Sequence, residues 1–159
     1  MMNTHNTLSQ NARNKSAALL NRQLAAAIDL HAQVKQAHWN VRGGQFIGLH
    51  ELFDGIASSV EDWSDLLAER AGALGSAAEG TIQMAAERSH LPPYPLNIAP
   101  GKVHVAALSA ALAAFGGETR SAIDESATLG DPVTSDILTE ITRAADQALW
   151  KLESHHEPA

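Results

Sequence analysis

Apolar residues recur at every third or fourth position on both sides of a Gly-Gly pair, and this pattern constrains the fold more than any other feature. The first stretch runs from about Ser16 to Val41 and the second from about Gln45 to Leu74. Such spacing places the apolar residues along one face of an α-helix. Glycine can adopt the left-handed backbone that ends a helix, so Gly43-Gly44 predicts a tight turn between two long helices.

The rest of the chain continues the helical pattern after one long interruption. Residues 76–100 contain a short helical stretch, Thr81 to Arg88, before Pro92-Pro93 prevents a longer helix. A third helix is predicted from about Lys102 to Leu129, and Asp131-Pro132 supplies the cap and first-turn proline of a fourth. Four helices with a long middle connection predict an all-α, ferritin-like four-helix bundle, with a short helix in the crossover between helices 2 and 3.

Composition agrees with a helical, acidic, single-domain protein. Of the 159 residues, 45% are hydrophobic but only 4% are aromatic, which favours closely packed helices over a β-sandwich. The net charge is −7 at pH 7, and the absence of cysteine excludes disulfides and thiolate metal sites. The polar N-terminus lacks the apolar core of a signal peptide, and no apolar run reaches the roughly 20 residues of a membrane span. We therefore expect a cytoplasmic protein without membrane contact, with a flexible tail over residues 1–15 and a bundle domain over residues 16–159.

Histidine and acidic side chains follow one side of the second predicted helix: His50, Asp54, Glu61, Asp65 and Glu69. His50 and Asp65 are fifteen residues apart, which is about 22 Å along a helix. Because metal–ligand bonds are about 2 Å long, His50 and Asp65 of one chain cannot bind the same ion. Two copies of this helix, packed antiparallel about a two-fold axis, would bring the His50 end of one to the Asp65 end of the other. The sequence therefore predicts two equivalent sites at an interface between subunits.

His38 belongs to the same end as His50, because the glycine turn sets the two helix ends side by side. The predicted site combines His38 and His50 of one subunit with Asp65 and Glu69 of its partner. Imidazole and carboxylate ligands suit Fe(II), Mn(II) or Zn(II). Asp54 follows His50 by one helical turn and is either a ligand or an acceptor that orients the histidine.

Three motifs lie in and around this hairpin: Lys35-Gln-Ala-His38-Trp39-Asn40, Phe46-Ile-Gly-Leu-His50-Glu51 and Asp65-x-x-Ala68-Glu69-Arg70. Together they resemble the Dps family, the DNA-binding proteins from starved cells, and the similarity covers roughly Leu20 to Ser154. The resemblance implies a dodecameric shell that oxidises Fe(II), mostly with hydrogen peroxide, at its two-fold interfaces. It also implies storage of the ferric mineral in a central cavity, which protects DNA from oxidative damage.

The residues that bind metal in this family correspond to positions present in the chain: His38, His50, Asp54, Asp65 and Glu69. His38, His50, Asp65 and Glu69 form the catalytic set of the implied ferroxidase. Iron is the implied metal, and Zn(II) or Mn(II) can occupy the same kind of site.

Further site residues are expected outside this ligand set. The resemblance implies iron-entry pores lined by acidic residues at the start of the fourth helix, here Asp131, Asp136 and Glu140. The alternative is that these charges complement the helix dipole, a role that Asp131 in particular could fill. Trp39 and Trp63 lie beside the site residues in the sequence, so either one of them intercepts stray oxidising equivalents or both pack at interfaces.

DNA contact is predicted only for the N-terminal tail, where Arg13 and Lys15 are the basic side chains and no acidic residue precedes Asp29. Phosphate affinity grows with the number of cations engaged and falls with salt, so we expect weak DNA association. Two other functions remain open at this point. One is a nucleoid-binding structural protein of starved cells, and the other is a non-catalytic shell that binds zinc or manganese.

Two Glu-x-x-His pairs match the ligand spacing of di-iron carboxylate proteins. Glu87-x-x-His90 lies in the proline-rich crossover and Glu153-x-x-His156 in the terminal segment. We interpret both pairs as accidental, because neither falls within the predicted bundle core.

Overall fold

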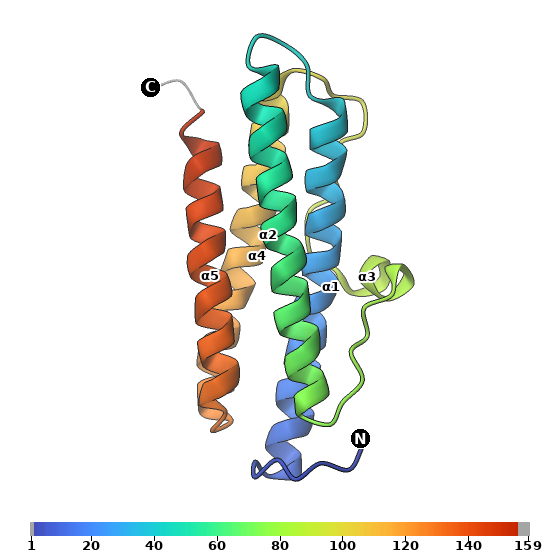
Figure 1. Ribbon diagram of the computed structural model, residues 1–159, viewed down its shortest axis with the longest axis vertical. Coiled ribbons are helices and arrows are strands. Elements are labelled where there is room, and N and C mark those ends of the chain that lie inside the picture. The colour runs from blue at the N-terminus through green and yellow to red at the C-terminus, as the bar shows by residue number, and fades with distance from the viewer. Residues whose placement is uncertain (1, 156–159) are drawn as a thin grey trace.

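The computed structural model describes residues 2–155 and contains five α-helices (Figure 1). They are α1 (Gln10–Asn40), α2 (Phe46–Ala73), α3 (Ile82–Arg88), α4 (Gly101–Thr128) and α5 (Pro132–Glu153). The four long helices form a bundle, and the short α3 lies beside α1 at the edge of the molecule. The predicted all-α bundle, with a short helix in its long crossover, is confirmed.

The bundle core is a continuous column of aliphatic side chains with three aromatic residues, Phe53, Trp63 and Phe115. The pairs α1–α2 and α4–α5 pack most extensively, and α1 also packs on α4. The largest fully buried residues include Leu20, Leu30, Phe53, Leu67 and Phe115. Since burying one such side chain contributes about 1.5–3 kcal/mol, this column is the main source of stability.

Glycines end the helices where the sequence pattern predicts. Gly43, Gly75 and Gly130 have φ angles of 116°, 83° and 73°, a region that side chains with a Cβ rarely adopt. Asp131 caps α5, accepting a hydrogen bond from the Thr134 N–H, and Pro132 occupies its first position. The turn chemistry read from the sequence is therefore the chemistry that the fold uses.

The first helix begins earlier than predicted. It starts at Gln10 rather than near Ser16, because the Ser9 side chain accepts a hydrogen bond from the Ala12 N–H and caps it. Residues 10–15, assigned from the sequence to a flexible tail, are therefore helical. Flexibility of residues 1–9 stays a prediction, and the last four residues of the predicted domain, 156–159, lie outside the described part of the chain.

Several hydrogen bonds attach the crossover between α2 and α4 to the bundle, and two of them lie around its prolines. The Gln33 amide of α1 donates to the Pro92 carbonyl at 3.1 Å, and the Tyr94 hydroxyl lies 2.6 Å from Nδ1 of His104 in α4.

Within residues 2–155, none of the helices has the length and apolar character needed to cross a membrane.

Candidate metal centre

His38 and His50 lie face to face where α1 ends and α2 begins. Their rings stack with centroids 3.7 Å apart and an interplanar angle of 21°. Each ring also bonds to the backbone of the other residue: Nδ1 of His38 lies 2.9 Å from the His50 carbonyl, and Nδ1 of His50 lies 2.9 Å from the His38 carbonyl. The predicted pairing of these two helix ends is thus present within a single chain.

The end of α1 explains why the His38 carbonyl is free to accept this bond. In a continuing helix it would accept from the N–H of Arg42, but that N–H donates to the carbonyl of Ala99 at 2.8 Å. Nδ1 of His50 donates to the His38 carbonyl in place of the Arg42 N–H. The end of α1 therefore gains a hydrogen-bond donor, and the His50 ring gains an acceptor.

The reciprocal bonds select the same tautomer for both rings. A carbonyl oxygen only accepts, so each Nδ1 carries a hydrogen, and in the neutral form of each ring Nε2 holds the lone pair. Metal-binding histidines characteristically donate their second ring N–H to an oxygen, which orients the ring and raises its basicity. His38 and His50 thus present the donor atoms that a divalent cation requires.

Asp54 lies beside this histidine pair on the exposed side of α2. Its Oδ1 accepts a hydrogen bond from Lys35 Nζ at 2.7 Å and lies 3.8 Å from Nε2 of His38. The Lys35 ammonium, through this bond and its charge, holds the pKa of Asp54 below its ordinary value. The carboxylate is therefore ionised and available to a cation that displaces Lys35.

Asp65 and Glu69 are exposed on α2, toward its C-terminal end. The structure does not bring them to the histidines, since fifteen residues separate His50 from Asp65, about 22 Å along the helix. Among residues 2–155, no three His, Asp or Glu side chains gather in a metal-binding group. The two groups of predicted ligands therefore lie apart within one subunit.

The two tryptophans differ in their surroundings. Trp39 is 61% exposed, with Lys35 Nζ 6.0 Å from its ring centroid. Trp63 is 5% exposed and stacks on Phe115 with ring centroids 5.8 Å apart. Trp63 therefore packs in the bundle core of its own chain, whereas Trp39 lies on the surface beside His38.

The three acidic residues at the start of α5 differ in their exposure to solvent. Asp131 is fully buried and pairs with Arg70 at 2.7 Å, while Asp136 and Glu140 are exposed. Burial alone would raise the pKa of Asp131, but hydrogen bonds from Thr134 and the charge of Arg70 outweigh it and lower the pKa. Asp131 has the helix-capping role that the sequence left as the alternative to a pore role.

The predicted DNA contacts lie on the first two turns of α1. Arg13 is partly buried and its Nη1 donates to the Leu74 carbonyl at 3.4 Å, so it caps the end of α2. Lys15 is exposed.

The two Glu-x-x-His pairs are interpreted as accidental from the sequence. Glu87 and His90 are both exposed, and His156 lies outside the described residues.

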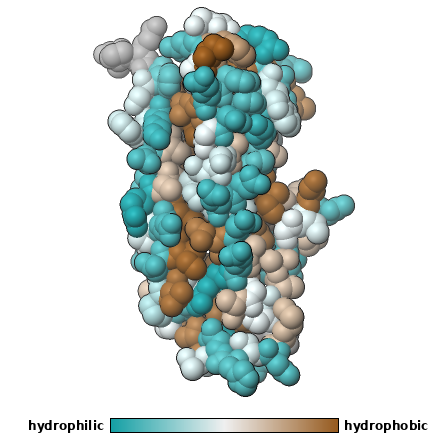
Figure 2. Space-filling model, viewed as in Figure 1, coloured by the Kyte–Doolittle hydropathy of each residue, from teal (hydrophilic) through white to brown (hydrophobic). Residues whose placement is uncertain are grey.

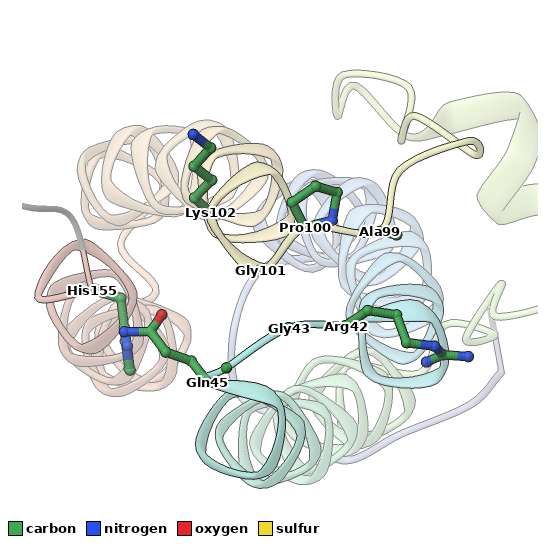
Figure 3. A pocket seen from close by; sticks show the side chains of 9 residues that line it. Arg42, Gly43, Gln45, Ala99, Pro100, Gly101, Lys102 and His155 are labelled. Atoms are coloured by element: carbon green, nitrogen blue, oxygen red, sulfur yellow. The ribbon is translucent and has the colours of Figure 1, made fainter.

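An open cavity of about 720 Å³ lies at the end of the bundle next to the α1–α2 turn (Figure 3). The side chains of Gln45 and His155 lie toward each other across one side, whereas Arg42 and Lys102 extend in other directions. The lining contains basic side chains but no carboxylate. It is therefore separate from the histidine pair and from the acidic end of α2.

Sequence reasoning missed the buried contact between Tyr94 and His104. Tyr94 is the only tyrosine of the chain, but it lies in an irregular, proline-rich segment. Periodicity cannot pair such a segment with a helix face, so only the tertiary structure reveals this contact.

Comparisons with known proteins match the whole chain. Residues 17–158 match the family described as "Ferritin-like domain". The curated "DNA protection during starvation protein" of Agrobacterium fabrum is 40% identical over 152 residues, which cover 96% of this chain and 94% of that relative.

Two solved structures extend the comparison. The "Mycobacterium smegmatis Dps tetragonal form" has a TM-score of 0.94 at 31% identity, covering 100% of this chain and 96% of that one. The "Structure of Dps from Microbacterium arborescens in the high iron form" has a TM-score of 0.85 at 30% identity, covering 91% and 93%.

Proposed function

Because this chain belongs to the Dps family of ferritin-like proteins, we propose that it oxidises Fe(II) at sites shared by two subunits and stores the ferric product in a homo-oligomeric shell. Iron is both substrate and cargo. Hydrogen peroxide is the preferred oxidant, and removing iron and peroxide together protects DNA. Two relatives support this assignment: one is named for DNA protection during starvation, and the other is a Dps structure in a high iron form.

The observation that carries the proposal is the division of α2 into two half-sites. At one end, reciprocal 2.9 Å bonds from Nδ1 hold the rings of His38 and His50, which leaves both Nε2 atoms without a hydrogen bond in the described part of the chain. At the other end, Asp65 and Glu69 are exposed and make no hydrogen bond or ion pair within residues 2–155. An antiparallel pair of α2 helices combines these complementary ends into two complete sites.

The surface of α2 and its neighbours supports such an assembly. Figure 2 shows hydrophobic side chains gathered along the seam between α2 and α5 on one face of the subunit. Trp39 and Ile47, near the histidine pair, are 61% and 62% exposed. Apolar surface of this kind is characteristic of protein–protein interfaces. We propose a dodecameric shell built from these dimers.

The chemistry follows from the ligand set. Two Fe(II) ions each give one electron to hydrogen peroxide, which takes up two protons and leaves as two water molecules. Consuming peroxide two electrons at a time avoids the one-electron reaction that releases hydroxyl radical. The imidazoles of His38 and His50 bind the ions, and the carboxylates of Asp65 and Glu69 neutralise the charge that grows from Fe(II) to Fe(III).

Asp54 adds a further carboxylate to the histidine half-site. A cation arriving at His38 competes with Lys35 for Asp54, whose pKa is already below the ordinary range. Asp136 and Glu140, exposed on α5, are proposed to attract Fe(II) to entry pores by their charge. Asp131 is left out of this pore because it is buried against Arg70.

Protection of DNA is proposed to be chemical rather than by tight binding. Arg13 is engaged with Leu74, which leaves Lys15 as the exposed cation of the predicted pair. A gel-shift series from low to physiological salt should show association only at low salt. Compaction of DNA at physiological salt would instead favour the nucleoid-binding function.

Fe(II) oxidation by peroxide and by oxygen tests the ferroxidase assignment. We expect His50→Ala and Asp65→Ala each to lower the oxidation rate at least about tenfold, since each removes a ligand. Glu61→Ala, an exposed acid on the same helix, is the matched control and should leave the rate unchanged. Equal rates in all four proteins would reject the site, and tight Zn(II) binding without oxidation would favour a non-catalytic shell.

A further inference from the structure

Tyr94 and His104 form a buried pair that the proposed ferroxidase does not use. The Tyr94 hydroxyl lies 2.6 Å from Nδ1 of His104, and within residues 2–155 it has no other hydrogen-bond partner. Tyr94 lies in the crossover and His104 in the first turn of α4. His104 is fully buried, and Tyr94 is partly buried against the core.

Aromatic rings and backbone groups surround His104, and no carboxylate of residues 2–155 contributes to its pKa shift. Its ring lies between the Tyr94 ring, 6.2 Å away by centroid, and the Phe53 ring, 6.5 Å away. Nε2 is buried without a hydrogen bond of good geometry, although the backbone groups of Asn40 and Ile98 face the ring. Among residues 2–155, no charged group contributes to the pKa shift of Tyr94 or His104.

The protonation states follow from this environment. Burial lowers the pKa of His104 and raises the pKa of Tyr94, so both groups are neutral near pH 7. The phenol hydrogen has only Nδ1 as an acceptor. Tyr94 therefore donates, Nδ1 of His104 holds a lone pair, and Nε2 carries the imidazole hydrogen.

Such a pair is arranged for coupled loss of a proton and an electron. Removing an electron from a phenol makes its hydroxyl strongly acidic, so the proton must leave at the same time. A base must lie within hydrogen-bond reach, about 2.6–3.2 Å, to accept it. Nδ1 of His104 meets this requirement at 2.6 Å, and the packing of Tyr94 against the core limits the access of solvent to the resulting radical.

The pair also lies close to the histidine half-site. Phe53 follows His50 by three residues on α2, which is about one helical turn. The ring centroids of Phe53 and His104 are 6.5 Å apart, and His104 forms a hydrogen bond with Tyr94. Short steps through packed aromatic rings thus connect the site of iron oxidation with the only tyrosine of the chain.

We propose that Tyr94 and His104 form a one-electron redox site that takes up oxidising equivalents escaping from the iron site. This inference rests on the proposed ferroxidase function as the source of the oxidant. The oxidant is hydroxyl radical, formed when one Fe(II) reduces hydrogen peroxide by one electron. Tyr94 gives it one electron and gives its hydroxyl proton to Nδ1 of His104. The products are a neutral tyrosyl radical, an imidazolium ion and hydroxide.

The presence of a single tyrosine makes the first experiment direct. Freeze-quenched electron paramagnetic resonance after mixing Fe(II) and hydrogen peroxide with the full protein should show a tyrosyl radical. Tyr94→Phe should abolish that signal while Fe(II) oxidation continues. Fe(II) oxidation at the wild-type rate without any tyrosyl signal would overturn the inference and leave the ferroxidase function intact.

The role of His104 needs a variant that retains a hydrogen-bond acceptor but removes the base. We expect His104→Gln to slow tyrosyl formation by about 10²-fold, in line with the contribution of a positioned base. His90→Gln, at an exposed position of the crossover that carries Tyr94, is the matched control and should have no effect. Equal radical formation in all three proteins would reject His104 as the proton acceptor.

A second measurement needs neither iron nor a variant that must fold. Flash oxidation of the iron-free wild-type protein by a ruthenium photo-oxidant should produce the tyrosyl radical more slowly in D2O than in water. A purely structural hydrogen bond would not cause this isotope effect. If His50→Ala shows that the ferroxidase function is wrong, this measurement still tests whether Tyr94 and His104 form a redox site. Absence of the isotope effect would overturn that inference.

Discussion

At the scale of single residues, buried polar groups act through the partners that the fold gives them. Asp131 and Arg70 form the most buried ion pair of residues 2–155, with side chains 0% and 11% exposed. His38 and His50 show the same dependence, since backbone carbonyls of the opposite helix select the Nδ1-protonated form of each ring. Residue type alone specifies neither arrangement.

Asp131→Asn tests the structural role of the buried carboxylate. The variant keeps a capping side chain but leaves the Arg70 cation without its charge partner, so we expect a loss of about 3 kcal/mol in the free energy of unfolding. Denaturant unfolding measures this loss. Asp136→Asn, an exposed neighbour on α5, should change it by no more than about 0.5 kcal/mol.

The same pair predicts a pH dependence. The pKa of Asp131 is lower in the folded protein than its ordinary value of 3.8. Its stabilising contribution is therefore present above pH 3.8 and is lost as the pH falls through the lower, folded value. Unfolding curves between neutral and acidic pH should be flatter for Asp131→Asn than for the wild type. Parallel curves would contradict the assignment.

At the scale of elements, the α1–α2 turn positions His38 and His50, the proposed metal ligands. Gly43 has φ of 116°, and the turn it allows sets the end of α1 beside the start of α2. The crossover contributes as well, because the Ala99 carbonyl takes the Arg42 N–H and leaves the His38 carbonyl to His50. Ligand geometry thus depends on backbone remote from the ligands in sequence.

Gly43→Ala should disturb both stability and the histidine pair. A side chain at this φ costs about 1–2 kcal/mol, and relaxing the turn shifts the two helix ends relative to each other. We expect lower thermal stability and slower Fe(II) oxidation. Gly44→Ala is the matched control, since a Cβ there meets no atom within 4 Å and φ is not positive. Equal behaviour of both variants would show that the turn does not position the site.

At the scale of the whole molecule, the proposed iron site requires two subunits. The histidine end and the carboxylate end of α2 are separated by more than half of the helix length, so the proposed ligands can meet only between two copies. We therefore propose that Fe(II) oxidation requires the assembly of at least two subunits. This dependence can be tested by mixing subunits.

Two inactive variants should restore activity when their subunits are mixed. A dimer of His50→Ala and Asp65→Ala subunits contains one doubly damaged site and one intact site. Random assembly of equal amounts makes half of the dimers mixed, so we expect about one quarter of the wild-type Fe(II) oxidation rate. Mixing after unfolding and refolding together, with separately refolded variants as control, measures this. No recovery would mean that each site lies within one chain.

The sequence by itself determined the helices, their order and the residue types of the site. Apolar periodicity and glycine positions act locally, so the bundle and its crossover helix could be predicted from them. The ligand spacing also excluded a site within one chain, because helix geometry is the same in every context. The cap at Ser9 is local too, but six polar or charged side chains between Thr7 and Ser16 hide the periodic pattern that would reveal it.

Only the tertiary structure decided which polar groups became partners. It buried Asp131 with Arg70 rather than exposing it beside Asp136, and it joined Tyr94 to His104 across an irregular segment. Such contacts connect residues far apart in the chain, and their free energy depends on burial and geometry that no local pattern contains. The proposed iron site depends on the same kind of contact one level higher, between the α2 helices of two subunits.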